Sequence, residues 1–425
     1  MLPRTMLLQT PLRLVCVVVA LSACASNVSG TQRDASADAV DATPLPDVNT
    51  DVAPDVSARC AWRVGARVDL ITGTATRCDL VDLVAANDGV WILRECDVRV
   101  TSTWELSLEH LGTDLTLTGQ ARLASGAMRP MSVAQSSIAV DDARDRRAAL
   151  VATETPSLRG FDARGNLTWQ RSVGTLPTSF SLGGHRDVAV TQAGFSVVAD
   201  QIRALWGGSL LRTDAMGATA DVVDLRLPTA QPARFSRFAL PDGGFVVAWR
   251  LPGAMGASAS LWARRYDEAG ASSDDARRIT DLPTMDGRFV LRPWNGSLVA
   301  LWEAEADTLP PLRGLAMRRL DASALPTIDT VALTALGFYG GGFDAAAARG
   351  DLLVAAVTGS GVLQLTVLPV RTDGAPPSEL LAVGPVEPMA PDAMRARLVA
   401  TATGALVAYR RTAAVVSVAA LTCAP

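Results

Sequence analysis

The sequence predicts an all-β fold, a seven-bladed β-propeller with four-stranded blades whose N-terminal strand completes the last blade. Three observations predict it. A short apolar strand recurs seven times, and each copy keeps the same order of strands and turns. The last copy lacks a fourth strand, while an extra strand precedes the first copy. A ring of repeats closed by this extra strand accounts for all three.

The recurring strand follows a turn and reads GVWILRE (89–95), AALVATE (148–154), GFSVVAD (194–200), GFVVAWR (244–250), SLVALWE (297–303), DLLVAAV (351–357) and GALVAYR (404–410). Its equivalent residues, Ile92, Val151, Val197, Val247, Val299, Val354 and Val407, lie 46 to 59 residues apart. That period is the size of a propeller blade. A pair of β-sandwiches or a right-handed β-helix is the rival fold, and the period and the paired turns favour neither.

Each copy contains two further turns and three further strands. An apolar strand such as RFSRFAL (234–240) precedes the recurring strand, and a third strand such as SLWARRYD (260–267) follows it. A second turn comes next, as in DARG (162–165), DAMG (214–217), DEAG (267–270) or TDGA (372–375), before a closing strand such as LTWQRSV (167–173). Strands joined by tight turns of this kind form antiparallel hairpins.

Two stretches resemble known propeller repeats. GGFVVAW (243–249) with ARRYDEAG (263–270) resembles repeats of bacterial surface propellers. LRGFDARGNLTWQRSVG (158–174) resembles one blade of the quinoprotein-type repeat, and only this copy contains the tryptophan.

The incomplete seventh copy predicts the disulfide pairing. Its third strand, AVVSVAALT (414–422), ends beside Cys423, and the extra strand AWRVGARVDLI (61–71) begins beside Cys60. If this strand completes the blade, Cys60 lies next to Cys423. Cys78 and Cys96 lie nine residues on either side of Asn87, in the turn of the first hairpin, and therefore face each other. Of the three pairings of four cysteines, this geometry selects Cys60–Cys423 with Cys78–Cys96.

The N-terminal 59 residues predict a secretory signal with a lipidation site, followed by a flexible tether. Residues 1–23 combine Arg4 and Arg13 with the apolar run LVCVVVALSA, as a secretory signal does. Leu21-Ser22-Ala23-Cys24 resembles the lipobox of bacterial lipoproteins, which implies that Cys24 is lipidated. Residues 24–59 hold the lipidated cysteine and an acidic tract that is rich in proline, lacks aromatic residues and is predicted to be disordered. As a flexible tether it would span roughly 30 Å.

These features predict an exported protein that is anchored to a membrane by lipid. By similarity to the sorting rule of enteric bacteria, Ala25 after the cysteine favours the outer membrane. The propeller is then residues 60–425, and we expect a monomer. The sequence leaves open whether the protein faces the periplasm or the outside of the cell.

Composition excludes several functions. All 39 basic residues are arginine, which removes Schiff-base chemistry and lysine-dependent phosphate loops. Only His110 and His185 are present, too few for a multi-histidine metal site. We therefore predict no cofactor and no metal site. A formal net charge of −4 gives no electrostatic case for nucleic acid as a partner.

Two hypotheses about function remain. The first is a non-catalytic binding or scaffold propeller at the cell envelope, comparable to the propeller lipoprotein of the outer-membrane barrel assembly machine. Its partner would be a protein, a polysaccharide or another anionic ligand. The alternative is a propeller enzyme of the glycosidase, lyase or lactonase type. Glu303, Glu305 and Asp307 are its best acidic candidates, although a solvated acidic loop explains them too. Trp91, Trp249 and Trp302 suit packing between blades.

Arginines near the start of the first strands form the candidate ligand site. They are Arg186, Arg234, Arg237, Arg288, Arg395 and Arg397. In a propeller these strands surround the central axis, so the guanidinium groups would converge on one mouth. Their paired N–H donors suit carboxylate or phosphate groups, including those of acidic sugars. The competing interpretation is that they pair with acids nearby, such as Asp187, Asp286 and Asp392.

Overall fold

A computed structural model of the protein describes most of the chain after residue 59. The described residues are 60–71, 73–128, 130, 135–153, 155–173, 186–201, 207–225, 233–240, 243–251, 259–272, 275–282, 288–305, 313–321, 323–327, 330–334, 338–359, 362–371, 380–388 and 395–424. The predicted signal peptide, the lipidation site Cys24 and the predicted tether lie outside them, apart from Cys60 at their edge.

The described residues form seven antiparallel sheets of four strands each, with one short 3-10 turn, Asp142–Arg144. Blade 1 contains β2 (Ala75–Ala86), β3 (Gly89–Val98), β4 (Thr103–Gly112) and β5 (Leu117–Gly126); blade 2 contains β6 (Ser137–Asp141), β7 (Arg146–Val151), β8 (Ser157–Phe161) and β9 (Leu167–Ser172); blade 3 contains β10 (Arg186–Val190), β11 (Gly194–Gln201), β12 (Gly207–Asp214) and β13 (Thr219–Asp224). Blade 4 contains β14 (Ala233–Ala239), β15 (Phe245–Leu251), β16 (Ala259–Tyr266) and β17 (Arg277–Leu282); blade 5 contains β18 (Phe289–Trp294), β19 (Ser297–Glu305), β20 (Arg313–Leu320) and β21 (Val331–Thr334). Blade 6 contains β22 (Phe338–Ala348), β23 (Asp351–Thr358), β24 (Leu363–Val370) and β25 (Leu381–Val386); blade 7 contains β26 (Ala396–Ala400), β27 (Gly404–Arg410), β28 (Val415–Ala424) and β1 (Ala61–Ile71).

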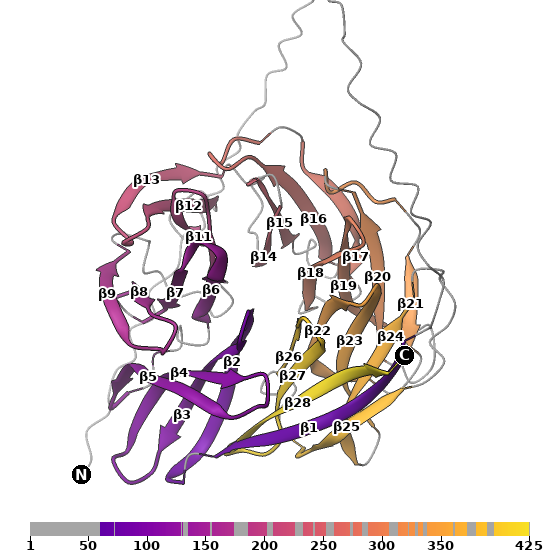
Figure 1. Ribbon diagram of the computed structural model, residues 1–425. Coiled ribbons are helices and arrows are strands. Elements are labelled where there is room, and N and C mark those ends of the chain that lie inside the picture. Colours follow the sequence, from indigo (N-terminus) through magenta and orange to yellow (C-terminus); the bar gives the residue numbers. More distant parts are fainter. Residues whose placement is uncertain are drawn as a thin grey trace, which may run out of the picture. The chain divides into compact units, whose positions relative to one another are not determined.

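These sheets form a seven-bladed β-propeller, as the sequence predicts (Figure 1). Every recurring apolar strand is the second strand of its blade. The ring closes where predicted, because β1 pairs antiparallel with β28 from Ala61↔Ala424 to Ile71↔Val415. In Figure 1 the indigo β1 runs along the yellow β28, so the first and last described strands share one sheet. The predicted extra strand is therefore the outer strand of blade 7.

The core of the described part is divided into seven apolar clusters, and each fills the space between two neighbouring blades. Trp91 lies in the cluster between blades 1 and 2, Trp249 between blades 3 and 4, and Trp302 between blades 4 and 5. All three are at most 2 % exposed. The prediction that these tryptophans serve blade packing is confirmed. Among the described residues, no helix is long and apolar enough to cross a membrane.

The turn between the third and fourth strands is built by the same aspartate in blades 2 to 5. Asp162, Asp214, Asp267 and Asp321 each accept main-chain N–H bonds with Oδ1, at 2.8 or 2.9 Å, from residues two to four positions later. Such a side-chain bond replaces main-chain partners in a tight turn. In blades 2 to 4 a glycine with positive φ ends the turn and meets a residue of the preceding blade, as Gly217 meets Trp169.

Substituting Gly217 should therefore cost more than left-handed strain alone. A Cβ at Gly217 would lie 2.3 Å from Trp169 Cζ3, whereas one at Gly296, which has nearly the same φ, meets nothing within 4 Å. We expect Gly296→Ala to lower the free energy of unfolding by about 1 kcal/mol. Gly217→Ala should cost about 2 kcal/mol more, because Trp169 must move. Urea denaturation measures both, and equal losses would contradict the contact.

Both predicted disulfides are present in the structure. Cys60 and Cys423 are joined with their Cα atoms 5.2 Å apart, across a sequence separation of 363. Cys78 and Cys96 are opposite each other on β2 and β3 and are joined as well. The first bond fixes the ring closure, and the second joins two strands within blade 1.

Candidate functional site

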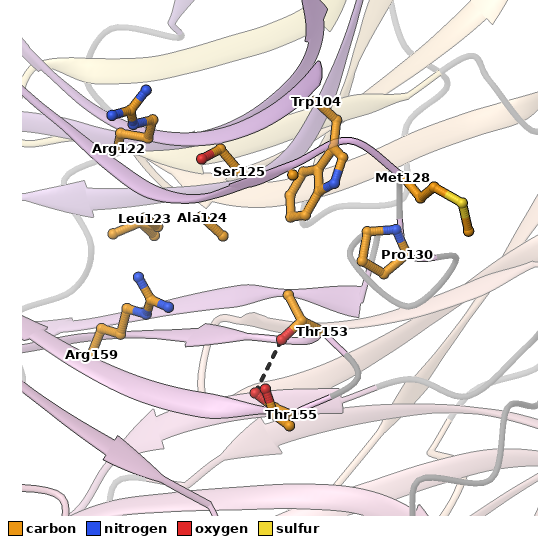
Figure 2. A pocket seen from close by; sticks show the side chains of 11 residues that line it. Trp104, Arg122, Leu123, Ala124, Ser125, Met128, Pro130, Thr153, Thr155 and Arg159 are labelled. Carbon is orange, nitrogen blue, oxygen red and sulfur yellow. Dashed lines mark hydrogen bonds between the residues drawn. The ribbon is translucent and has the colours of Figure 1, made fainter. Parts of the chain in front are cut away.

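Two sites that contain arginines lie on one face of the propeller: a group at the start of the first strands and a pocket between two blades. In a four-stranded antiparallel blade, the first strand begins and the fourth strand ends at the same face, which we call the upper face. Arg288 and Arg395 lie directly before β18 and β26, first strands that surround the axis of the ring (Figure 1). A pocket between blades 1 and 2 opens near the end of β5 (Figure 2).

A belt of polar residues runs along the first strands. We count each second strand from the first residue after its turn, that is from Gly89, Arg146, Gly194, Gly244, Ser297, Asp351 and Gly404. The fifth residues then have as cross-strand partners Asp82, Ser137, Asp187, Ser236, Val290, Asp344 and Arg397. Six of these seven belt positions are polar. Because side chains alternate between the two faces of a strand, the belt positions share one face of the first strands.

Three belt side chains connect one blade to the next. Asp82 accepts the N–H of Ile138 at 2.9 Å, Ser137 Oγ that of Val188 at 3.1 Å, and Asp344 that of Leu398 at 3.1 Å. Each donor follows the belt position of the next blade. The first strands of neighbouring blades diverge and make no ladder, so these side chains satisfy main-chain groups that would otherwise be buried unpaired. The belt acids thus have a structural role.

The axial arginines, by which we mean Arg288, Arg395 and Arg397, belong to blades 5 and 7. Arg395 Nη1 and Arg397 Nη2 each reach across to β2 of blade 1, where they lie 3.5 Å from the carbonyl oxygens of Leu80 and Val81. Arg397 Nε lies 3.9 Å from Asp82, and its side chain is 29 % exposed. The contacts of Arg397 are long, so its guanidinium group retains donor capacity.

The axial arginines repel one another. Burial, and next the charge of Arg397, lower the pKa of Arg395 to about 10; Arg288 acts in the same direction, while Asp79 and Glu95 oppose it. Three arginines thus lie within electrostatic range of each other, in a partly desolvated place. Burial also raises the pKa of Asp82, against the charge of Arg397 and the N–H bonds from Ile138 and Leu83.

The other predicted arginines do not join this group in the described part of the chain. Arg237 is buried, donates to Ser196 O and Oγ at 3.1 and 2.6 Å, and lies over the ring of Phe245. It connects blades 3 and 4. Arg186 begins β10 and Arg234 lies in β14, but their side chains lie outside what the structure describes.

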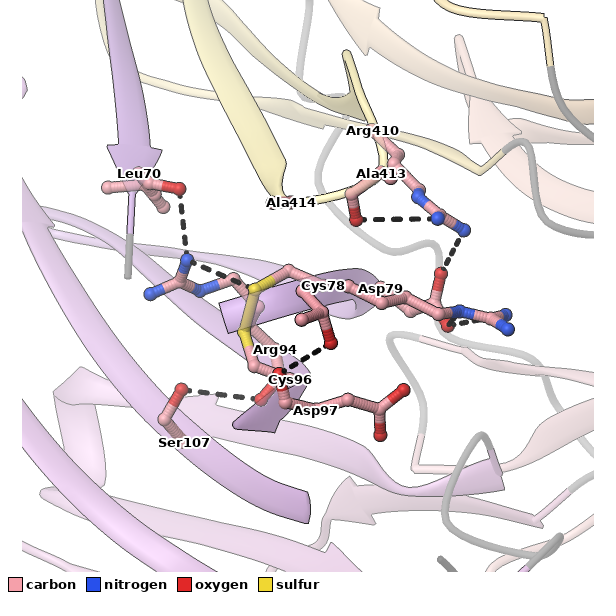
Figure 3. Close-up of a disulfide and its surroundings, with 12 residues drawn as sticks. Leu70, Cys78, Asp79, Arg94, Cys96, Asp97, Ser107, Arg410, Ala413 and Ala414 are labelled. Carbon is pink, nitrogen blue, oxygen red and sulfur yellow. Dashed lines mark hydrogen bonds and ion pairs between the residues drawn. A yellow bond between two sulfur atoms is a disulfide. The ribbon is translucent and has the colours of Figure 1, made fainter. Parts of the chain in front are cut away.

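Beside the axis, the seam between blades 7 and 1 contains buried ion pairs (Figure 3). Arg94 and Glu109 are 4 % and 2 % exposed and lie 2.5 Å apart, and Arg94 also donates to Leu70 O of β1 at 3.0 Å. Asp79 of blade 1 pairs with Arg410 of blade 7 at 2.5 Å. Charged groups thus hold the seam, next to the Cys78–Cys96 disulfide within blade 1.

Neither a metal site nor the predicted acidic group is built by the described residues. They contain no cluster of three or more His, Cys, Asp or Glu that could hold a metal ion. Glu303 lies in β19, whereas the side chain of Glu305 and all of Asp307 lie outside the described residues.

Sequence reasoning missed the belt acids Asp82 and Asp344 and the partner of Asp344. Arg292 of β18 donates to Asp344 of the next blade and to Ala345 O at 3.0 Å, and Asp344 is 1 % exposed. The available signal was a lone acid inside an apolar first strand, as in GGGFDAAAA (340–348) and LVDLVAA (80–86).

Comparisons with known proteins found no family and several solved structures of low identity. No protein-family model matches the sequence, and no curated protein matches it. The chain is similar to a puromycin-hydrolysing peptidase of Mycobacterium tuberculosis (14 % identity, TM-score 0.49), with 82 % of this chain and 52 % of the peptidase covered. It thus spans about half the length of that peptidase. The chain is also similar to an ulvan lyase (8 % identity, TM-score 0.46), with 83 % of this chain and 95 % of the lyase covered. It is similar to the propeller domain of the Trilobed protease from Pyrococcus furiosus (8 % identity, TM-score 0.45), with 79 % of this chain and 90 % of that domain covered.

Proposed function

We propose that the protein is a non-catalytic binding propeller at the cell envelope, held there by lipid on Cys24. Its axial arginines bind an anionic group of a polymer or protein partner. The observation that carries the proposal is the position of Arg288, Arg395 and Arg397 at the start of first strands, where the charges of Arg288 and Arg397 act on Arg395.

Mutual repulsion is what favours an anion here. Arginines whose charges repel one another in a partly buried place gain when an anion enters, because it neutralises the repulsion and accepts their N–H donors. Asp79 offsets little of this charge, since Arg410 and Arg77 already pair with it at 2.5 and 3.0 Å. Asp82 offsets less of the arginine charge than an exposed acid would, because burial raises its pKa and so disfavours its charged form.

The test is binding of dextran sulfate, with uncharged dextran as the reference. We expect the full chain to bind dextran sulfate with an affinity that falls as salt rises. Arg288→Gln with Arg397→Gln should weaken binding at least 10-fold, since two charge-assisted contacts are lost. Isothermal titration measures the affinity.

The matched control is Arg63→Gln with Arg99→Gln, which removes the same charge from two exposed positions. If this control loses as much affinity as the axial variant, net charge alone attracts the polymer and the axial site is wrong. Thermal unfolding of each variant checks that the fold is intact.

The alternative is a propeller enzyme acting on a carbohydrate or another small substrate. Its best observation is Asp82, a carboxyl at the axis whose pKa burial raises. A general acid needs an oxygen that can reach substrate, but both oxygens of Asp82 already accept main-chain N–H bonds, from Leu83 at 2.9 Å and Ile138 at 2.9 Å. The binding function is therefore the better supported of the two.

The anchor has its own test. Cys24→Ala should release the protein from the membrane fraction and abolish acyl labelling, because a stable anchor depends on acyl chains attached at that residue. Fractionation and labelling with a fatty-acid analogue measure this, with Cys16→Ala as the control inside the predicted signal peptide. Unchanged membrane association of Cys24→Ala would overturn the lipoprotein assignment.

A further inference from the structure

The pocket between blades 1 and 2 is a second place on the upper face. Its volume is about 510 Å³, within the range of sites for small molecules. The end of β5, the start of β4 and the residues between β7 and β8 line it. It is separate from the axial arginines, which belong to blades 5 and 7.

The pocket has two chemically different ends (Figure 2). Arg122 and Arg159 lie at one end, and Trp104, Met128 and Pro130 lie at the other. Hydroxyl groups line the pocket as well, from Ser125 of β5 and from Thr153 and Thr155, of which Thr153 Oγ1 donates to the carbonyl of Thr155 at 3.0 Å.

The cationic end is only partly neutralised. Arg122 pairs with Glu105 at 3.2 Å, but its side chain is 64 % exposed, so water screens that pair. Arg159 Nε donates to a neutral partner, Ser157 Oγ, at 3.2 Å. No ion pair involves Arg159 within the described residues, and burial lowers its pKa.

The other end contains a donor without a partner. Trp104 is 4 % exposed, and its indole Nε1 has no hydrogen-bond acceptor among the described residues. A buried N–H of this kind costs free energy unless an acceptor reaches it. The pocket therefore offers a cationic end, hydroxyl groups and a vacant N–H donor beside an apolar surface.

We propose that this pocket binds a carboxylated sugar residue. The carboxylate lies between Arg122 and Arg159, where forked N–H donors match its two oxygens. The sugar hydroxyls bond to Ser125 and Thr153, and an oxygen of the ring accepts the N–H of Trp104. The apolar face of the ring covers Pro130.

The probe is glucuronate, titrated into the full chain by calorimetry, with glucose, acetate and benzoate for comparison. We expect glucuronate to bind at least 10-fold more tightly than glucose, which lacks the carboxylate, and than acetate, which lacks the ring. Arg159→Gln should weaken glucuronate binding about 10- to 100-fold, and Trp104→Phe about 2- to 10-fold through the lost N–H. The indole ¹⁵N–H NMR signal that Trp104→Phe removes should shift on binding.

Arg171→Gln is the matched control, because Arg171 is an exposed arginine of β9 outside the pocket lining. Arg171→Gln should leave the affinity for glucuronate unchanged, and so should Arg397→Gln at the axis. The test of the pocket is therefore independent of the test of the axial arginines. Arg122→Gln serves as a second variant if Arg159→Gln unfolds. The proposal would be overturned if glucose or acetate bound as tightly as glucuronate, or if Arg159→Gln bound glucuronate as tightly as the unchanged protein. Tighter binding of benzoate than of glucuronate would identify an aromatic-acid site instead.

Discussion

Replacing Cys60 and Cys423 together with serine should lower the free energy of unfolding by about 5 kcal/mol, the largest loss we expect from any cross-link in the chain. The bond closes a loop with a sequence separation of 363, whereas Cys78–Cys96 spans 18. In the chain-entropy model a bond that closes a longer loop removes more freedom from the unfolded state. The same replacement at Cys78 and Cys96 should cost about 3 kcal/mol.

Urea denaturation of the two double variants measures the difference between them. Hydrogen exchange should also show faster opening of β1 and β28 when the Cys60–Cys423 bond is absent, because only the strand ladder then holds blade 7 closed. Equal losses from the two double variants would show that chain entropy does not govern these bonds.

Glu109→Leu should cost about 3 to 5 kcal/mol, because it leaves the Arg94 guanidinium buried without its carboxylate. The remaining contact of Arg94 with Leu70 O is a neutral acceptor and cannot replace it. Adding Arg94→Met removes the stranded charge, so the double variant should recover most of the loss. Denaturation of the single and double variants gives the coupling energy.

The matched control is Glu105→Leu, alone and with Arg122→Met. Glu105 of β4 and Arg122 of β5 form an ion pair in the same blade, but the Arg122 side chain is 64 % exposed. Breaking this pair should cost at most about 1 kcal/mol. A loss for Glu109→Leu no larger than for Glu105→Leu would mean that water reaches Arg94 in solution.

The blade count, the ring closure and both disulfides could be predicted because each depends on order along the chain. A repeat of similar length locates the second strands, and a missing strand at one end with an extra strand at the other defines the closure. Neither inference requires knowing which way a side chain points.

The axial site could be predicted only in part, because it depends on which face of a strand each arginine side chain occupies. Arg397 pairs with the fifth residue of its second strand and lies on the belt, whereas Arg237 pairs with the fourth residue, Val247, and is buried between blades. A shift of one residue reverses the face of a strand. The turns differ in length, as Ala86↔Gly89 and Ala400↔Ala405 show, so counting back from the recurring strand could not separate the two cases.

The position of the Cys60–Cys423 bond has a mechanical consequence for a protein tethered at its N-terminus. A pull that arrives through the residues before Cys60 would, without the bond, peel β1 from β28 one pair at a time, beginning at Ala61↔Ala424. With the bond, the load passes from Cys60 directly to Cys423. Both strands of the closing pair then bear the tension together, so a pull through the tether that we propose would reach the ring without opening it at its joint.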